Sequence, residues 1–472
     1  MSASKIKFSR VTSKRNHWIK KNIYYHQNII DFYKFNIPPK SIILEVGCGN
    51  GYLLNNLAPK LGIGIDTSSE MIKEAEELHS KSPHNRFIQM SAENLKLKQV
   101  FDFIIFSDSL GYFQDVQKVF QEVKKVSSSD TRLIVNYHSF MWHPLLNLAE
   151  KLHLKMPSER LNWLNSSDIE GLLNLAGFEI IKKGNRFLCP FNFSFFSKLI
   201  NKYFAPLPLL NRFCLINYII AKPIEYLFKH NRNFSVSIII PARNEKGNIE
   251  NAIKLIPQMG QYTEIIFIEG HSTDGTLEEI QRVCEKYSKQ RNLRYFVQSG
   301  IGKGDAVRMG FSKASGDILM ILDADLTVPP QDLIKFYNAL ATGKGEYING
   351  SRLVYPMEKE AMRTLNIIGN KFFSIMFTWI LGQRIKDTLC STKALFKKHY
   401  QKIQQNRYYF GDFDPFGDFD LIFGSAKLNL KMVEIPIRYK ARIYGTTNIS
   451  RFKHGLLLLK MVLFSLNKLK FI

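Results

Sequence analysis

The chain has 472 residues, of which 45% are hydrophobic, so it is long enough for two domains that each bury a core. Its five cysteines are scattered and include no CxxC pair, which excludes a disulfide framework and a zinc site of the usual spacing and fits a reducing cytoplasm. The net charge of +24 favours an acidic partner, either an anionic membrane or nucleic acid, unless the lysines only form a solvated surface.

The first chemical signal follows a predicted strand at residues 41–46. Gly47, Gly49 and Gly51 come directly after it, so the backbone can turn sharply there and approach a ligand closely. The next predicted strand ends in Asp66, whose carboxylate can accept both hydroxyls of a ribose. A glycine loop followed by a strand-end acid indicates a nucleoside-type cofactor in a doubly wound α/β sheet.

The spacing does not suit a dinucleotide fingerprint, and the run E-V-G-C-G-N-G resembles the class I S-adenosylmethionine-dependent methyltransferases. Segments at 91–94, 101–106, 133–136 and 176–180 extend the resemblance over about residues 20 to 190. It implies S-adenosylmethionine as cofactor, with contacts from Glu45, Gly47, Gly49, Gly51, Asp66, Ala92, Glu93 and Asp108.

The methyl acceptor cannot be read from the sequence. Asp108, Tyr112 and His138 are candidates to line its pocket, but each also suits a strand end or a core position. Methyl transfer from a sulfonium depends on alignment more than on acid–base help. A domain that keeps the fold and binds nothing is the alternative.

Residues 191–232 mix aromatic side chains with Pro206, Pro208 and a few lysines. We expect an apolar, aromatic linker between the two domains. A lipid-facing hairpin and a packed connection fit this composition equally.

The second domain opens with a predicted strand that ends at Pro241, and further strands follow at 264–268, 293–297 and 318–322. Helical patterns alternate with these strands, which predicts a mostly parallel sheet whose ligands lie beyond the carboxyl ends of the strands. The last of these strands runs into Asp323-Ala324-Asp325. Mg²⁺ and Mn²⁺ prefer such oxygens and usually reach protein through one or two carboxylates plus substrate phosphates.

A glycine-rich turn at the start of the helix after 293–297 adds a phosphate cradle, which contains Gly302 and Lys303. The motifs SIIIPARNE, STDGT, GKGDAVRMGF and GDILMILDAD together resemble the inverting family-2 glycosyltransferases of the GT-A fold, and most of all the polyprenol-phosphate sugar synthases of the dolichol-phosphate mannose synthase type. The resemblance covers about residues 236 to 448. It implies a nucleotide-diphosphate sugar bound by Pro241, Arg243, Asn244, Glu245, Glu269, Asp274, Gly302, Lys303, Asp323 and Asp325.

The same resemblance assigns roles. Asp323 and Asp325 would hold the metal and the diphosphate, and Arg442 would face the lipid phosphate or the diphosphate. Asp418 and Asp420 fall where the family has acidic residues on the acceptor side. A phosphate acceptor needs little help from a base, whereas a sugar hydroxyl would need such a carboxylate.

Two features leave alternatives open. Asp418 and Asp420 are crowded with Asp412 and Asp414, so a purely structural acidic loop also fits. The family usually has two adjacent acids after the second strand, whereas this chain has Glu269-Gly270, which leaves the nucleotide base undetermined.

The sequence of residues 451–472 predicts a basic amphipathic helix whose apolar run is too short to span a bilayer. As an interfacial helix it would direct Lys460, Lys468 and Lys470 to lipid phosphates. A core helix packed on the second sheet is the alternative.

We therefore expect an α/β enzyme with two doubly wound domains: a methyltransferase at 1–190, the linker at 191–232, a glycosyltransferase at 233–450 and the helix at 451–472. It would methylate from S-adenosylmethionine and transfer a sugar, with Mg²⁺ or Mn²⁺, to a polyprenyl phosphate or glycan-lipid acceptor in surface glycan synthesis. Because the first residues lack an apolar signal, we expect a cytoplasmic enzyme at the inner face of an anionic membrane, without a nucleic-acid partner. The alternatives are transfer to a growing polysaccharide chain, and an RNA methyltransferase with a non-catalytic C-terminal module.

Overall fold

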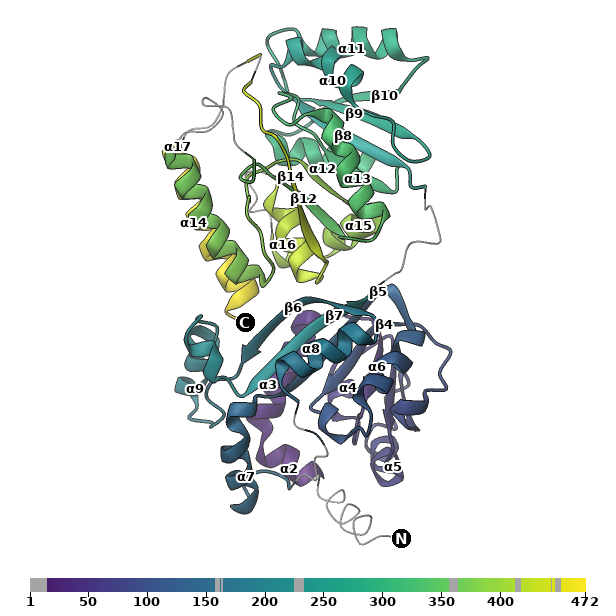
Figure 1. Cartoon of the computed structure of the whole chain (residues 1–472), viewed down its shortest axis with the longest axis vertical. Coiled ribbons are helices and arrows are strands. Elements are labelled where there is room, and N and C mark those ends of the chain that lie inside the picture. Colours follow the sequence, from purple (N-terminus) through teal and green to yellow (C-terminus); the bar gives the residue numbers. More distant parts are fainter. Residues whose placement is uncertain are drawn as a thin grey trace. The chain divides into compact units, whose positions relative to one another are not determined.

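The computed structural model describes residues 15–157, 162, 164–224, 233–355, 364–411, 417–442, 444–445 and 451–472, without the side chains of 364–368 and 451–454. The chain divides into two compact units, Met1–Glu225 with Phe471–Ile472, and Tyr226–Lys470. Each unit has its own seven-stranded sheet with helices packed on it (Figure 1). The prediction of two α/β domains is thereby confirmed.

The first sheet has the strand order β3-β2-β1-β4-β5-β7-β6. The strands from β3 to β5 run parallel, and β7 runs antiparallel to both β5 and β6. Their bounds are β1 (Ile42–Val46), β2 (Leu61–Asp66), β3 (Asn85–Gln89), β4 (Phe101–Ser107), β5 (Ser127–His138), β6 (Phe178–Arg186) and β7 (Ile216–Pro223).

Helices cover both faces of this sheet because its strands are apolar on both sides. Leu44 and Ile104 belong to one core, whereas their chain neighbours Ile43 and Ile105 belong to the other, as the two-residue period of a strand requires. The helices and short turns are α2 (Arg15–Lys21), α3 (Ile23–Asn36), α4 (Tyr52–Asn56), α5 (Ser69–Leu78), η1 (Ala92–Asn94), η2 (Leu110–Tyr112), α6 (Val116–Lys125), η3 (Phe140–Trp142), α7 (His143–Lys151), α8 (Ser166–Leu175), α9 (Phe195–Leu199), η4 (Ile200–Phe204) and η5 (Leu210–Phe213).

The structure differs from the linker prediction over residues 191–224. This segment belongs to the first unit, and its last part is strand β7, which pairs with β5 on one side and β6 on the other. Ile219, Ile220 and Ala221 are fully buried there, so the apolar run serves a central strand rather than a connection between domains. Residues 225–232 lie outside the described part of the chain.

The second sheet has the order β10-β9-β8-β11-β13-β12-β14. The strands from β10 to β11 run parallel, β13 is antiparallel to both β11 and β12, and β14 is parallel to β12. The bounds are β8 (Val236–Ala242), β9 (Thr263–Glu269), β10 (Asn292–Val297), β11 (Ile318–Ile321), β12 (Tyr347–Ser351), β13 (Lys393–Phe396) and β14 (Met432–Pro436).

In the second unit, helices alternate with strands along the sequence. The fully buried strand residues Ile238, Ile240 and Met320 form one core with residues of α10 and α13. The helices and turns are η7 (Lys246–Asn248), α10 (Ile249–Leu255), α11 (Thr276–Tyr287), α12 (Lys303–Lys313), η8 (Pro330–Asp332), α13 (Leu333–Ala341), α14 (Thr364–Leu381), α15 (Lys397–Gln405), η9 (Arg407–Tyr409), α16 (Phe419–Lys427), α17 (Arg451–Ser465) and η10 (Leu466–Lys470).

The C-terminal helix α17 packs along α14 (Figure 1). Two of the lysines expected to reach lipid phosphates make contacts inside the unit instead. Lys470 Nζ donates to the Trp379 carbonyl at 2.9 Å, and Lys468 Nζ lies 5.0 Å from the centre of the Tyr409 ring, whereas Lys460 is exposed. Burial lowers the pKa of Lys470 to about 8. None of the described helices is both long and apolar enough to cross a membrane.

A buried ion pair fixes the loop before β13. Asp387 is fully buried and pairs with Arg352, which follows β12, through bonds of 2.7 Å and 2.8 Å. Burial alone would raise the pKa of Asp387, but Arg352 lowers it to about 2. Glu434 of β14 accepts the backbone N–H of Asp387 at 3.0 Å, so the loop is held from two strands.

Replacing Asp387 with alanine would leave the Arg352 guanidinium buried without its carboxylate. We expect Asp387→Ala to destabilise the second unit by about 3–5 kcal/mol. Urea unfolding of the full chain, with hydrogen exchange in β12 and β13, measures this loss. Asp332→Ala is the matched control, because its partner Lys335 is exposed, and it should cost less than about 0.5 kcal/mol. Equal losses in the two variants would contradict the expectation.

Candidate functional site

The glycine loop of the first unit follows β1 in a conformation that suits glycine. Gly47, Gly49 and Gly51 have φ angles of 77°, 53° and 72°. A Cβ on Gly51 would lie 2.3 Å from the Phe87 ring, so a side chain there is excluded by contact as well as by backbone conformation. Asp66 at the end of β2 accepts the Gly49 N–H at 2.9 Å and thereby fixes the loop.

Glu45 lies at the base of this loop and is 3% exposed. Its Oε2 accepts the Leu54 N–H of α4 at 3.1 Å. Burial raises the pKa of Glu45 to about 8, although the nearby Arg15 opposes the shift. Through this hydrogen bond, Glu45 holds α4 next to the end of β1.

A cavity of about 1350 Å³ opens in front of the loop and lies within the first unit. This volume exceeds that of most single-ligand pockets, so it has room for a cofactor and a second molecule. Of the eight residues predicted to contact the cofactor, seven line this cavity: Glu45, Gly47, Gly49, Asp66, Ala92, Glu93 and Asp108. The eighth, Gly51, does not line it.

Glu93 and Ala92 form one side wall of this cavity in the turn η1. Glu93 Oε1 accepts the Gln114 N–H at 3.0 Å, and Oε2 accepts the Ser91 hydroxyl. Burial would raise the pKa of Glu93, but these hydrogen bonds lower it. Glu93 is therefore a charged residue that holds η1 against the segment after η2.

Asp108 is at the centre of a polar cluster that also lines the cavity. Its carboxylate accepts Tyr25 Oη–H at 2.5 Å and Asn136 Nδ2–H at 2.9 Å, and His138 Nδ1 lies 3.8 Å away. Asp108 itself has a φ of 53°, a strained backbone of the kind found at functional sites. Tyr112 and His138, the other candidates for the acceptor pocket, line the same cavity.

The N-terminal helices supply residues that the sequence did not identify. Arg15, Tyr25 and His26 of α2 and α3 line the cavity, and the Arg15 side chain lies against the glycine loop at Gly49. Burial, together with the charge of Arg15, lowers the pKa of His26 to about 4, so its imidazole is neutral at pH 7. The sequence offers only the Tyr-Tyr-His run at 24–26, which does not distinguish a pocket wall from a core face.

In the second unit, two basic side chains meet the acids that follow β11. Lys303 Nζ, at the first residue of α12, lies 2.7 Å from Asp323 Oδ1, and Ser391 donates its hydroxyl to Oδ2. Arg442 NH2 lies 2.7 Å from Asp325 Oδ2. The sequence predictions for Lys303, Arg442 and the two acids thus fall at one place.

The two carboxylates differ in their protonation behaviour. Burial and the adjacent charge of Asp323 raise the pKa of Asp325. Burial would also raise the pKa of Asp323, but Lys303 holds it below its ordinary value. The acids therefore compete for positive charge at this end of the sheet.

Arg442 also connects the acids to the loop after β8. Its NH1 lies 2.9 Å from Glu245 Oε1, and Asn248 Nδ2 donates to the other oxygen at 2.7 Å. Asn244 precedes Glu245 with a φ of 57°, and its Oδ1 accepts the Thr273 N–H at 2.9 Å. The loops after β8 and β9 are therefore held together.

The remaining predicted donor residues lie around the same loops. Glu269 is buried, and its carboxylate accepts the N–H groups of His271 and Ser272, so it caps its own loop. Asp274 accepts Tyr444 Oη–H at 3.2 Å, which connects the loop after β9 to the segment after β14. Within the part of the chain that the structure describes, Pro241, Arg243 and Gly302 make no side-chain polar contact at the site, and Arg243 and Gly302 are exposed.

The two predicted acceptor-side acids are paired with basic residues. Asp418 is buried, and its Oδ1 lies 3.5 Å from Nζ of the buried Lys393. Asp420 Oδ2 lies 3.3 Å from Arg407 Nε and 3.9 Å from Arg308 NH1. Asp412 and Asp414 of the predicted acidic loop lie outside the described residues.

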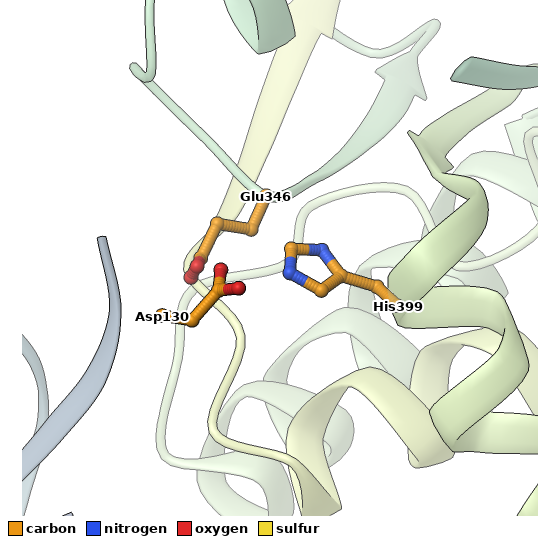
Figure 2. Close-up of side chains that lie close together, drawn as sticks. All are labelled: Asp130, Glu346 and His399. Carbon is orange, nitrogen blue, oxygen red and sulfur yellow. The ribbon is translucent and has the colours of Figure 1, made fainter. Parts of the chain in front are cut away.

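A separate cluster of polar side chains lies elsewhere in the second unit. Figure 2 shows Glu346, which precedes β12, beside His399 of α15. Glu346 Oε2 accepts the Lys431 N–H at 2.8 Å, which is a structural role. Asp130, also labelled there, belongs to the first unit, so these three side chains do not define a metal site of either unit.

Two family models match the chain. Residues 19–183 match a model described as methyltransferase domain, and residues 237–425 match one described as glycosyl transferase family 2. The structure of a methyltransferase from Thermotoga maritima, titled a possible histamine N-methyltransferase, is 18% identical and covers 46% of this chain and 98% of its own. Its TM-score of 0.36 is too low to support a conclusion.

Three curated relatives are similar to part of the chain. Glycosyltransferase AglJ of Haloferax volcanii is 28% identical over 47% of this chain and 68% of its own length. A dolichol-phosphate mannosyltransferase of Pyrococcus furiosus is 36% identical over 25% of this chain and 33% of its own. An undecaprenyl-phosphate 4-deoxy-4-formamido-L-arabinose transferase of Pectobacterium carotovorum is 25% identical over 46% and 64%. The match thus spans less than two thirds of the latter two proteins.

The matched ranges cover most strands of the two sheets and contain Asp66, Asp108, Lys303, Asp323 and Asp325, whereas Arg442 and strands β7 and β14 lie beyond them. The chain is therefore a two-domain transferase that joins a methyltransferase domain to a glycosyl transferase family 2 domain.

Proposed function

We propose that this chain is a bifunctional enzyme of surface glycan synthesis. Its second unit transfers a sugar, with inversion, from a nucleotide diphosphate to a polyprenyl phosphate or glycan-lipid acceptor, and its first unit transfers a methyl group from S-adenosylmethionine. The observation that carries the proposal is the convergence of Lys303 and Arg442 on Asp323 and Asp325 beyond β11. The enzyme would work at the inner face of an anionic membrane.

A divalent cation fits the two acids. Asp325 has a raised pKa because it is buried beside Asp323, and a cation between carboxylates relieves such repulsion. Asp323 and Asp325 would hold Mg²⁺ or Mn²⁺ through hard oxygen ligands. The ion would supply Lewis-acid stabilisation of a leaving diphosphate. Lys303 and Arg442 bring two further positive charges to the place where that diphosphate would lie.

The pairing of the acceptor-side acids favours a phosphate acceptor. Asp418 and Asp420 each lie beside a basic partner, so both carboxylates are already engaged within the protein. A phosphate is already a nucleophile and needs no such base. The printed names of the Pyrococcus and Pectobacterium relatives, which contain dolichol-phosphate and undecaprenyl-phosphate, support the same class of acceptor.

The first unit offers a site that fits S-adenosylmethionine. Gly47 and Gly49 line the cavity with backbone, since a Cβ there would meet Ser109 and Arg15, and Asp66 lines the same cavity. S-adenosylmethionine would supply an electrophilic methyl group. Asp66 and Glu93 would orient the cofactor, and the Asp108 cluster would orient the acceptor. Methylation of the same glycan is the simplest account of the fusion.

The first test follows labelled sugar. Radiolabelled nucleotide sugars, first screened by thermal shift with Mn²⁺, should transfer label to undecaprenyl phosphate and into the organic phase. Label confined to a water-soluble polymer would favour a growing polysaccharide as acceptor. Salt-sensitive RNA binding without affinity for any nucleotide sugar would favour an RNA methyltransferase instead.

Asp325→Ala removes one acid from the site and the partner of Arg442. We expect sugar transfer to fall by about 100-fold or more, because charge stabilisation at the leaving group is lost. S-adenosylmethionine binding, measured by calorimetry, should not change. Asp332→Ala, on an exposed ion pair of the same unit, is the matched control. Unchanged transfer in Asp325→Ala would contradict the assigned role.

Gly49→Arg tests the cradle of the first unit. A Cβ on Gly49 would lie 2.8 Å from the Arg15 side chain, and φ is positive there, so the loop must distort. We expect S-adenosylmethionine affinity to fall at least about tenfold, ~1.4 kcal/mol, with sugar transfer intact. Loss of both activities in this variant and in Asp325→Ala would mean that the two units form one interdependent site.

Glu45 makes the stability of the first unit depend on pH. Its pKa is raised from 4.5 to about 8, so the folded state keeps a proton that the unfolded state loses. The free energy of unfolding should therefore fall as pH rises from about 5 to 8. Glu45→Gln should flatten this dependence, measured as the melting temperature of the first unit at pH 5.5 and pH 8. The same slope in the variant would refute the assignment.

A further inference from the structure

Two stretches of the first unit expose an unusual number of large apolar side chains. Their exposed fractions lie between 44% and 75%. Soluble proteins rarely expose so many together unless the surface binds something. We refer to the two stretches, residues 140–154 and 191–209, as the apolar rim. Residues 140–154 contribute Phe140, Met141, Leu145, Leu148, Leu152 and Leu154, and residues 191–209 contribute Phe191, Phe193, Phe195, Phe196, Phe204 and Leu209.

The apolar rim borders the cavity of the first unit. Leu145, Leu148 and Phe191 are more than half exposed and also line the cavity, so they form its edge. Helices α7 and α9, which carry much of the rim, lie at the same edge of the first unit in Figure 1. Trp142 Nε1 donates to the Phe213 carbonyl at 2.9 Å, which holds the two parts together. Exposed apolar side chains from both stretches thus lie at the opening of the cavity.

Basic residues outnumber acidic ones along the rim. From residue 187 to 213 the sequence contains no Asp or Glu, while Lys198, Lys202 and Arg212 are exposed. Between residues 140 and 157 the sole acid is Glu150, which is paired with Lys155, and Lys151 is exposed nearby. Aromatic and leucine side chains flanked by lysines and unopposed by acids complement an anionic lipid surface.

We propose that the apolar rim docks the methyltransferase unit on an anionic lipid bilayer, so that the cavity opens at the membrane surface and takes a lipid-linked methyl acceptor. The aromatic rings would lie at the boundary of headgroups and acyl chains, and Lys198 and Lys202 would reach the lipid phosphates. The inference rests on the proposed function in treating the cavity as the S-adenosylmethionine site. The docking surface itself rests on exposure and charge alone.

Vesicle sedimentation of the full chain tests the surface. The vesicles contain phosphatidylglycerol and phosphatidylethanolamine, and the variant carries Phe195→Ser and Phe196→Ser, at positions 68% and 69% exposed. Its partition coefficient should fall at least about tenfold. Leu175→Ser is the matched control, because Leu175 is 69% exposed on α8 outside the rim, and it should bind as the original chain does. Equal binding of both variants would overturn the proposal.

A charge variant separates electrostatic from apolar attraction. Lys198→Glu with Lys202→Glu should weaken binding to these vesicles at low salt and much less at high salt. Vesicle binding that changes neither with the charge reversal nor with the salt concentration would overturn the assigned role of the lysines.

Two further measurements distinguish loss of lipid docking from misfolding and from dimerisation. Calorimetric binding of S-adenosylhomocysteine should be equal in all variants, which shows that they fold. Loss of vesicle binding in the rim variant with no cofactor binding in any protein would refute the cofactor site and leave the docking surface standing. Analytical ultracentrifugation without lipid tests the competing occupant: a dimer that dissociates in the rim variant, together with no vesicle binding, would overturn the proposal in favour of a second copy of this chain.

Discussion

The repulsion between Asp323 and Asp325 is the constraint around which the second unit is organised. Two carboxylates separated by one residue at a partly buried strand end are unfavourable unless positive charge is brought to them. The fold brings Lys303 from the start of α12 and Arg442 from beyond β14. In this arrangement, a metal ion or a substrate could replace the side chains of Lys303 and Arg442 as the neighbours of the acids. The structural neutralisation of the acids and the proposed diphosphate site therefore depend on the same charge distribution.

The first unit solves a different physical problem. Its loop after β1 lines the cavity with the backbone of Gly47 and Gly49 rather than with charged side chains. Asp66 and Glu45 then hold the loop from the strand end and from below. One domain thus presents backbone to a ligand, and the other presents opposed charges. This contrast suits a nucleoside cofactor in one case and a diphosphate in the other.

Local sequence patterns predicted the parts of the structure that local interactions determine. Gly47, Gly49 and Asp66 lie in one strand–loop–strand segment, and Lys303 opens a helix whose turn could be read directly. Strand β7 was missed because its apolar run joins β5 and β6 through long-range pairing that no local pattern encodes. The partners of Asp418 and Asp420 were missed for the same reason, since Lys393 and Arg407 are distant in sequence or lie on another element.

The position of Arg442 in the chain has a consequence for biosynthesis. It lies 117 residues after Asp325 and 197 residues after Glu245, yet it pairs with both. The ribosome must therefore synthesise 117 residues beyond Asp325 before the acids can receive this partner. The acids after β11 therefore remain without this cation while β12, β13 and β14 are translated, so the second unit completes this charge pairing only after its last strand has been made.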